Sequence, residues 1–174
     1  MTSGIAGNWI SELAQQHLDA AYNLGRWLLR NDQDAADAVH DAYVRAARSA
    51  HTYAGGNARA WFLAIVRNCC LAKIALRKRD THLQVVDDQP DESGDVEDRA
   101  HNAQCSAIVA KHLRALPVEF REVLILREFE DFSYREIADS LDVPIGTVMS
   151  RLARGRAMLQ RALGDSAQES TYGL

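Results

Sequence analysis

The chain has 174 residues, of which 47% are hydrophobic, and carries a net charge of −4. This length can bury a core as one ordinary domain or as two small ones. The longest apolar runs fall far short of the about 20 residues that span a bilayer, and no basic segment followed by an apolar run opens the chain, so we expect a cytoplasmic protein without membrane insertion.

Charge is distributed unevenly along the chain. Residues 1–79 carry 10 Lys/Arg and 6 Asp/Glu, residues 80–100 carry 1 and 8, and residues 101–174 carry 9 and 10. Within the last section, residues 143–164 contain four arginines and no acidic residue. A local basic surface of this kind can meet nucleic-acid phosphates although the whole chain is acidic.

Apolar residues at helical spacing predict three helices in the N-terminal part. The first covers residues 9–30, and the second begins at a cap on Asp32 or Asp34. A loop at residues 55–57 precedes the third helix, whose end is basic, as suits a helix C-terminus. The basic residues at that end are Lys73, Arg77, Lys78 and Arg79.

The next segment, residues 80–102, lacks periodicity, is strongly acidic and contains a proline and a glycine, so we expect a flexible linker. Helical periodicity resumes near Ala103 and is interrupted at Pro117. The sequence therefore predicts an all-α protein with two small helical domains on a flexible acidic linker. The predicted ranges are 9–79 for the first domain, 103–164 for the second and 165–174 for a C-terminal tail.

The most specific local pattern is a helix-turn-helix. Ser133 and Glu136 have the spacing of a capping box, Asp142 can adopt the left-handed conformation of a tight turn, and Pro144 suits the start of the last helix. The second helix of such a motif enters the DNA major groove. The same pattern also fits an αα-hairpin with a solvated arginine face. The side chains expected to face DNA are Thr147, Ser150, Arg151, Arg154 and Arg156.

Two stretches of the chain resemble the extracytoplasmic-function (ECF) sigma factors of the sigma-70 family. The C-terminal part resembles their −35 reading region 4, and the N-terminal part resembles their region 2, in the family's order. The residues that carry the C-terminal resemblance are 116–117 (LP), 120–122 (FRE), 133–138 (SYREIA) and 143–152 (VPIGTVMSRL). Those that carry the N-terminal resemblance are 35–43 (AADAVHDAY) and 60–68 (AWFLAIVRN).

The resemblance implies a factor that is not an enzyme, that binds core RNA polymerase through its β′ and β subunits, and that directs transcription initiation at −10 and −35 promoter elements. Because an acidic linker joins two lobes that would each expose a polymerase-facing or DNA-facing surface, we also expect an anti-sigma protein that binds between or around the lobes. By the same resemblance, core polymerase is contacted by Asp37, His40, Asp41 and Arg45. The −10 element is contacted by Tyr53, Asn57, Arg59, Trp61, Arg67, Asn68 and Lys73, although a tryptophan at helical spacing usually packs into a core.

The chain departs from the family pattern at several positions. Ala36 and His40 stand where the family usually has Glu and Gln, and Ala72 and Ala75 stand where Asp and Arg are common. Met149 occupies a position at which many relatives carry Arg or Lys. A thioether cannot donate a hydrogen bond to a base or pair with a phosphate, so we expect one charged −35 contact fewer.

Two other functional classes fit parts of the sequence. An ordinary helix-turn-helix repressor or activator would use the N-terminal part for dimerisation or sensing, but it does not need the motif at residues 60–68. A metal-dependent phosphotransferase could use the acidic residues at 87–92, but these lie in the unpatterned linker without a glycine-rich phosphate loop.

The cysteines do not indicate a metal site. Cys69, Cys70 and Cys105 form no CxxC pair, and their spacing from His82 and His101 does not present two ligands together. We expect reduced thiols, no metal and no cofactor.

Overall fold

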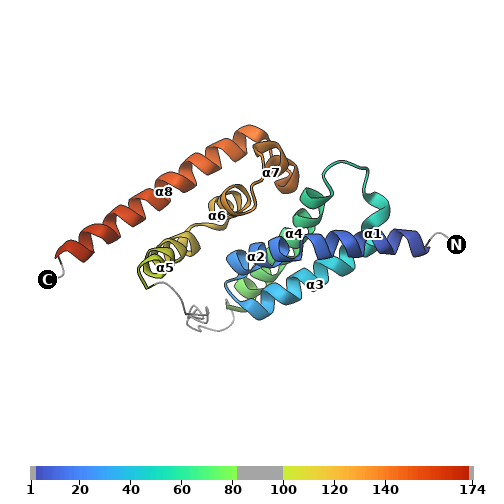
Figure 1. Ribbon diagram of the computed structural model, residues 1–174, viewed down its shortest axis with the longest axis horizontal. Coiled ribbons are helices and arrows are strands. Elements are labelled where there is room, and N and C mark those ends of the chain that lie inside the picture. The colour runs from blue at the N-terminus through green and yellow to red at the C-terminus, as the bar shows by residue number, and fades with distance from the viewer. Residues whose placement is uncertain (1–2, 82–99, 173–174) are drawn as a thin grey trace.

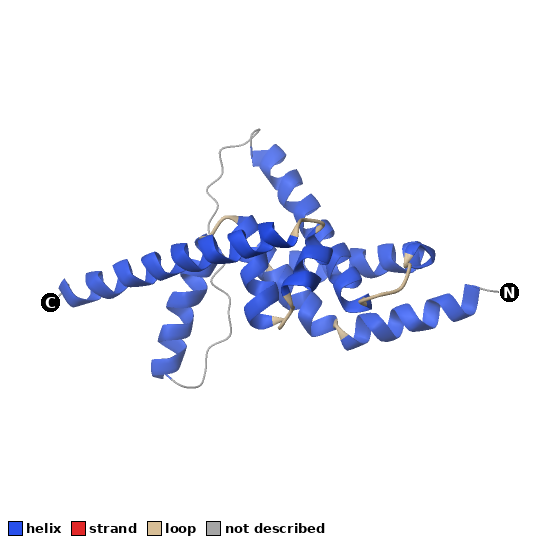
Figure 2. Ribbon diagram, turned by 90° about the horizontal axis from the view of Figure 1, so that it is seen from above, coloured by secondary structure: helices blue, strands red, loops and turns tan. Residues whose placement is uncertain are grey.

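The computed structural model describes residues 3–81 and 100–172, and all regular elements within these ranges are helical (Figure 1, Figure 2). The predicted all-α architecture is confirmed. The N-terminal lobe contains α1 (Ser3–Gln16), α2 (Leu18–Leu29), α3 (Asp32–Ser49), a 3-10 turn (Ala50–Thr52) and α4 (Ala58–Thr81). The C-terminal lobe contains α5 (Ala100–Ala115), α6 (Val118–Leu124), a π-helical turn (Ile125–Phe129), α7 (Tyr134–Leu141) and α8 (Ile145–Tyr172).

The helix predicted over residues 9–30 is bent into α1 and α2. The bend lies at His17, whose φ and ψ are −118° and 17°. Helical hydrogen bonds continue on both sides, because the His17 amide donates to the Leu13 carbonyl and the His17 carbonyl accepts from Ala21. Both halves pack on α3 and α4, but α1 also contacts the 3-10 turn, whereas α2 also packs on α6 of the other lobe. The bend allows each half to bury its own apolar face.

Asparagine side chains cap two of the N-terminal helices. The Asn31 side chain accepts from the Asp34 amide at 2.8 Å and begins α3, so the cap lies one residue before the predicted Asp32. The Asn57 side chain accepts from the Ala60 amide at 3.0 Å and begins α4. Asparagine and aspartate are equally good caps, which is why sequence alone does not choose between neighbours.

The helix-turn-helix forms as predicted. The Ser133 hydroxyl accepts from the Glu136 amide at 3.2 Å, and the Glu136 carboxylate accepts from the Ser133 amide at 2.7 Å, which completes the capping box. Asp142 ends α7 in the left-handed conformation with φ of 53°. The second helix, α8, continues through the predicted tail to Tyr172 and projects from the lobe (Figure 1).

Close packing against α6 sets the position of α8. A Cβ atom at Gly155 would lie 3.1 Å from Leu124 Cδ1 and 3.3 Å from Phe120 Cβ. This is tighter than ordinary side-chain contact, so the absence of a side chain at Gly155 lets the two helices approach.

The two lobes pack against each other, chiefly through α2 with α6 and α4 with α7. Arg121 of α6 is only 4% exposed, and its guanidinium donates to the carbonyls of Leu116 and, across the lobe boundary, Leu28 at 3.2 and 3.3 Å. Burial, with Arg30 nearby, lowers the pKa of Arg121 to about 10. The predicted linker lies mostly outside the described residues, since α4 ends at Thr81 and α5 begins at Ala100.

Candidate nucleic-acid interface

The beginning of α8 exposes part of the predicted −35 face. Ser150 and Arg154 are exposed, and Thr147 is half-buried. On the opposite side of the helix, Val148 and Leu152 are 0% and 1% exposed and pack into the core of the lobe. This orientation presents one side of α8 to solvent from its first turn onward.

The arginines of this face are not equivalent. Arg151 is half-buried and its Nη1 lies 3.4 Å from Glu122 Oε1. Arg156 pairs with Glu128 at 2.7 Å, and this hydrogen bond raises the pKa of Arg156. Arg154 forms no ion pair with any residue that the structure describes. It is therefore the arginine of this face that is most available to a ligand.

Two exposed apolar side chains lie in the first turns of α8, on a different side of the helix from Arg154. Ile145 is 49% exposed and Met149 is 54% exposed, and their spacing of one turn places them on the same side of α8. Sequence reasoning did not identify the exposure of Ile145. Its position directly after Pro144, four residues before Met149, is the signal that could have found it.

The arginines of the predicted −10 face lie at the lobe boundary and contact carboxylates. Arg67 of α4 binds Glu122 through both nitrogens of one edge, with Nε at 2.7 Å and Nη2 at 3.0 Å from the two carboxylate oxygens. Arg59 pairs with Glu130 at 3.0 Å. The Asn57 side chain also donates to Glu136. These residues of α4 and its N-cap are thus gathered on one face, and acidic residues of the C-terminal lobe cover it.

The predicted aromatic residues pack with a third one. Tyr53 and Trp61 have ring centroids 5.3 Å apart, and Trp9 lies 5.3 Å from Tyr53 and 6.0 Å from Trp61. The Tyr53 hydroxyl donates to the Gly56 carbonyl at 2.6 Å and holds the loop before α4. Trp61 is half-buried in this cluster, as its helical spacing suggested.

The other two predicted −10 residues lie further along α4. Asn68 is exposed and accepts from Arg67 Nη1 at 3.5 Å. Lys73 Nζ lies 3.8 Å from Asp37 Oδ2, which joins a predicted −10 residue to a predicted polymerase residue.

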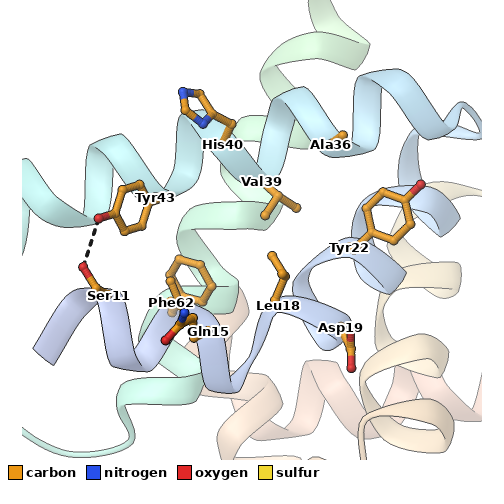
Figure 3. Close-up of a pocket in the computed structure, with 11 residues that line it drawn as sticks. Ser11, Gln15, Leu18, Asp19, Tyr22, Ala36, Val39, His40, Tyr43 and Phe62 are labelled. Carbon is orange, nitrogen blue, oxygen red and sulfur yellow. Dashed lines mark hydrogen bonds between the residues drawn. The ribbon is translucent and has the colours of Figure 1, made fainter. Parts of the chain in front are cut away.

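The residues predicted to contact polymerase are all exposed on α3: Asp37, His40, Asp41 and Arg45. His40 also lines a mainly apolar groove of about 580 Å³ between α1, α2 and α3 (Figure 3). Leu18, 50% exposed, and Val39 lie on its floor, and the Ser11 and Tyr43 hydroxyls share a hydrogen bond of 3.0 Å at one end. An exposed polar helix beside an apolar groove can bind a protein partner.

The described cysteines are buried. Burial raises the pKa of the Cys69 thiol and raises that of Cys70 to about 12, so both are poor thiolates. Among the described residues no cluster of His, Cys, Asp and Glu could hold a metal ion. The side chain of Cys105, and both His82 and His101, lie outside the part of the chain whose side chains the structure describes.

Comparison with known proteins assigns both lobes. The Sigma-70 region 2 model matches residues 13–81, and the Sigma-70 region 4 model matches residues 107–159. The ECF RNA polymerase sigma factor SigM of Mycobacterium tuberculosis is 33% identical over 154 residues, which cover 88% of this chain and 76% of SigM. The chain belongs to the ECF group of the sigma-70 family. SigE of Mycolicibacterium smegmatis is also 33% identical, over 91% of this chain but 63% of its own length, so this sigma factor spans less than two thirds of that relative.

Two solved structures share the fold. The sigma factor RpoE from Bartonella quintana, solved with the anti-sigma factor NepR, has a TM-score of 0.70 and 25% identity over 88% of this chain and 96% of that one. CnrH, solved with the cytosolic domain of CnrY, has a TM-score of 0.66 and 23% identity, over 94% of this chain and 95% of that one. In the described part of this sigma factor, no helix has the length and hydropathy to cross a membrane.

Proposed function

We propose that this sigma factor binds core RNA polymerase through its β′ and β subunits and directs it to promoters by recognising −10 and −35 elements, as a non-catalytic cytoplasmic initiation factor. The observation that carries the proposal is the open face of α8 behind a complete capping box and a left-handed turn. In a helix-turn-helix this face lies in the major groove.

The polymerase-binding part of the proposal rests on α3. Its residues Asp37, His40, Asp41 and Arg45 are exposed on a helix whose other side is buried. The variant Asp41→Arg with Arg45→Asp exchanges the two charges without changing the net charge, and it should weaken binding to core enzyme by at least about tenfold, because opposed charges at an interface are costly.

A matched control is available in the same lobe. Arg26 and Asp32 form an exposed ion pair of 2.8 Å, and Asp32 lies nine residues from Asp41, on the opposite side of α3. The variant Arg26→Asp with Asp32→Arg makes the same exchange there and should bind core normally. Equal core binding by both variants would remove the α3 surface from the proposal.

An anti-sigma protein is a further proposed partner. The similar sigma factor from Bartonella quintana was solved with the anti-sigma factor NepR, and CnrH was solved with the cytosolic domain of CnrY. In this sigma factor the groove lined by Leu18, Val39 and Tyr43 lies next to the proposed polymerase face, so a partner seated there would block core binding. Pull-downs from the native host under several stresses test this, and recovery of polymerase alone under all of them contradicts it.

The decisive experiment for the whole proposal is in vitro transcription with core polymerase. Core enzyme with this protein should start transcription at defined sites on genomic fragments of the host, whereas core alone or protein alone should not. A helix-turn-helix repressor or activator would bind DNA but would not give core enzyme this ability. Failure to bind core and to start any transcript would overturn the assignment of activity.

A further inference from the structure

Three carboxylates of the C-terminal lobe cover the proposed −10 face of the N-terminal lobe. We call Glu122, Glu130 and Glu136 the acidic row. Each of them binds a different proposed −10 residue, across 55, 71 and 79 residues of sequence respectively. The partners, in the same order, are Arg67, Arg59 and Asn57.

The contacts use the groups that would bind DNA. The Glu122 carboxylate accepts two parallel hydrogen bonds from one edge of the Arg67 guanidinium, at 2.7 and 3.0 Å. Arginine binds a phosphate with the same fork geometry. The guanidinium carbon of Arg59 lies 4.6 Å from the centre of the Phe132 ring, so an aromatic residue also covers it. The carboxylates on Arg67 and Arg59, and the Phe132 ring on Arg59, thus take up the interactions that these arginines could make with the phosphates and bases of a single strand.

Burial makes the two occupants mutually exclusive. The side chains of Glu122 and Glu130 are 2% and 7% exposed, and Arg67 is 17% exposed. The Ser140 hydroxyl also donates to the Ala60 carbonyl at 3.3 Å, which brings α7 against the first turn of α4. While the C-terminal lobe stays in place, a strand of DNA cannot reach the edge of Arg67 that Glu122 holds, and it has only partial access to Arg59, which is 32% exposed.

The same geometry limits the cost of opening. Glu122 Oε1 lies 3.4 Å from Arg151 of its own lobe, so this carboxylate keeps one cation when Arg67 leaves. A carboxylate left without a partner would oppose separation strongly. The Nε atom of Arg59 is buried without a hydrogen-bond partner among the described protein groups, and opening returns it to water.

We propose that the acidic row is an internal competitor of single-stranded promoter DNA: in the free chain it occupies the −10 face, and it leaves that face when the lobes separate on core polymerase. This inference rests on the proposed function of the N-terminal lobe. It makes the free protein a weak binder of single strands, although its N-terminal lobe is basic.

The test compares two full-length variants with equal net charge. One carries Glu122→Gln, Glu130→Gln and Glu136→Gln. The control carries Asp131→Asn, Asp139→Asn and Asp165→Asn, three exposed positions of the same lobe. The probe is a fluorescent mixed-sequence 12-nucleotide single strand. We expect the acidic-row variant to bind at least about fivefold more tightly than the control and to have a larger radius of gyration in solution scattering.

Equal affinity of the two variants overturns the proposal, because the charge change alone then accounts for any gain over wild type. If neither variant binds the strand, both the competitor and the −10 assignment of Arg59 and Arg67 are wrong. In that case, core-dependent transcription by the wild-type protein would still support the sigma activity. Failure of the competitor proposal can therefore be told apart from failure of the proposed function. Circular dichroism of each variant verifies folding.

A second, independent observation concerns the first two turns of α8. Arg151 and Arg156 are paired with carboxylates, whereas Ile145 and Met149 are 49% and 54% exposed at the end of the helix that enters the groove. Residues near the N-terminus of a recognition helix contact base edges, and apolar side chains there contact the methyl group of thymine. The geometry points to a −35 element in which Ile145 and Met149 read thymine methyl groups, again on the basis of the proposed function.

The experiment selects −35 sequences with holoenzyme from a promoter fragment randomised over the −35 hexamer. Wild type should select thymine at one or two positions, and replacing those thymines by deoxyuridine should weaken binding about threefold to tenfold. The variant Ile145→Ala with Met149→Ala should lose both the preference and the sensitivity to deoxyuridine. Unchanged binding of wild type to every deoxyuridine fragment overturns the assignment. The assignment is also overturned if the holoenzyme starts transcription but selects no −35 sequence. The proposed sigma activity would be in doubt only if transcription were lost as well.

Discussion

The two proposed DNA surfaces of this sigma factor differ in how their arginines are held. On α4, Arg59 and Arg67 are both paired with carboxylates of the other lobe at 3.0 and 2.7 Å. On α8, Arg154 is exposed and has no ion-pair partner among the described residues, although its neighbours are paired within their own lobe. The proposed −10 surface on α4 is therefore covered by the other lobe, whereas the proposed −35 surface on α8 is open to solvent.

The difference shows why local charge is an incomplete guide to a binding surface. Both regions are basic in sequence. Whether an arginine can reach a phosphate depends on where its paired carboxylate lies and on how deeply that carboxylate is buried. Exposed pairs such as Arg156 with Glu128, 46% and 48% exposed, exchange readily with solvent and ligand. Pairs with a nearly buried carboxylate, such as that of Glu122, exchange only when the surrounding structure moves.

The largest expected effect is on stability. Glu122→Ala removes a carboxylate that is 2% exposed and serves both Arg67 and Arg151, so it should lower the free energy of unfolding by about 3 kcal/mol, near the lower limit for a broken buried pair because the arginines keep some solvent contact. Glu128→Ala breaks an exposed pair and should cost about 0.5 kcal/mol. Urea denaturation measures both, and equal losses would contradict the contrast in burial.

The next effect is on −35 binding. Arg154→Ala should weaken holoenzyme binding by about 1 to 3 kcal/mol and relax preference at one or two positions if the guanidinium contacts a base through two hydrogen bonds. If it contacts only phosphate, the loss should be uniform across sequences and the salt slope should fall by about one unit. Arg161→Ala, further along the same helix and also exposed, is the control. Wild-type affinity of the Arg154 variant would show that this face does not read DNA.

The smallest effect is a titration at the bend between α1 and α2. Burial, and secondarily the charge of Arg59, lowers the pKa of His17 below 6.5. The unfolded chain therefore binds more protons than the folded one between that lowered pKa and 6.5, and the contribution of His17 to stability falls as the pH drops through this window. Nuclear magnetic resonance should give a midpoint below 6.5 that rises in Arg59→Ala. A His17 titration midpoint at or above 6.5 would contradict the burial of His17 and the nearby position of Arg59.

Features encoded within one or two turns were predictable from sequence. The capping box at Ser133, the left-handed Asp142 and the break at Pro117 depend on neighbours in the chain, and the structure contains each of them. The outward position of the predicted −35 residues followed from helical spacing, although their use in reading DNA stays a prediction. Met149 was singled out by the family resemblance and not by spacing, and the exposure of Ile145 was not predicted.

Features that depend on tertiary contacts were not predictable. The pairing of Arg67 with Glu122 joins residues 55 positions apart, and no periodicity relates them. The bend at His17 separates α1, which also contacts the 3-10 turn, from α2, which also packs on α6 of the other lobe, and the π-helical turn at 125–129 follows a buried α6 without a local signal. Charge counts placed Glu130 in a weakly acidic segment but could not show that it covers Arg59.

The absence of a side chain at Gly155 helps to set the position of α8, the proposed reading helix, on α6. It lies on the side of α8 that touches Leu124 and Phe120, ten residues after Ile145, which is about 15 Å along the helix axis. A methyl group there would lie 3.1 Å from Leu124 Cδ1 and 3.3 Å from Phe120 Cβ, so these neighbours and α8 would have to move apart by a few tenths of an ångström. On the proposed function, Gly155→Ala should therefore change −35 selection by holoenzyme through the position of α8 on α6, while leaving every proposed reading side chain in place.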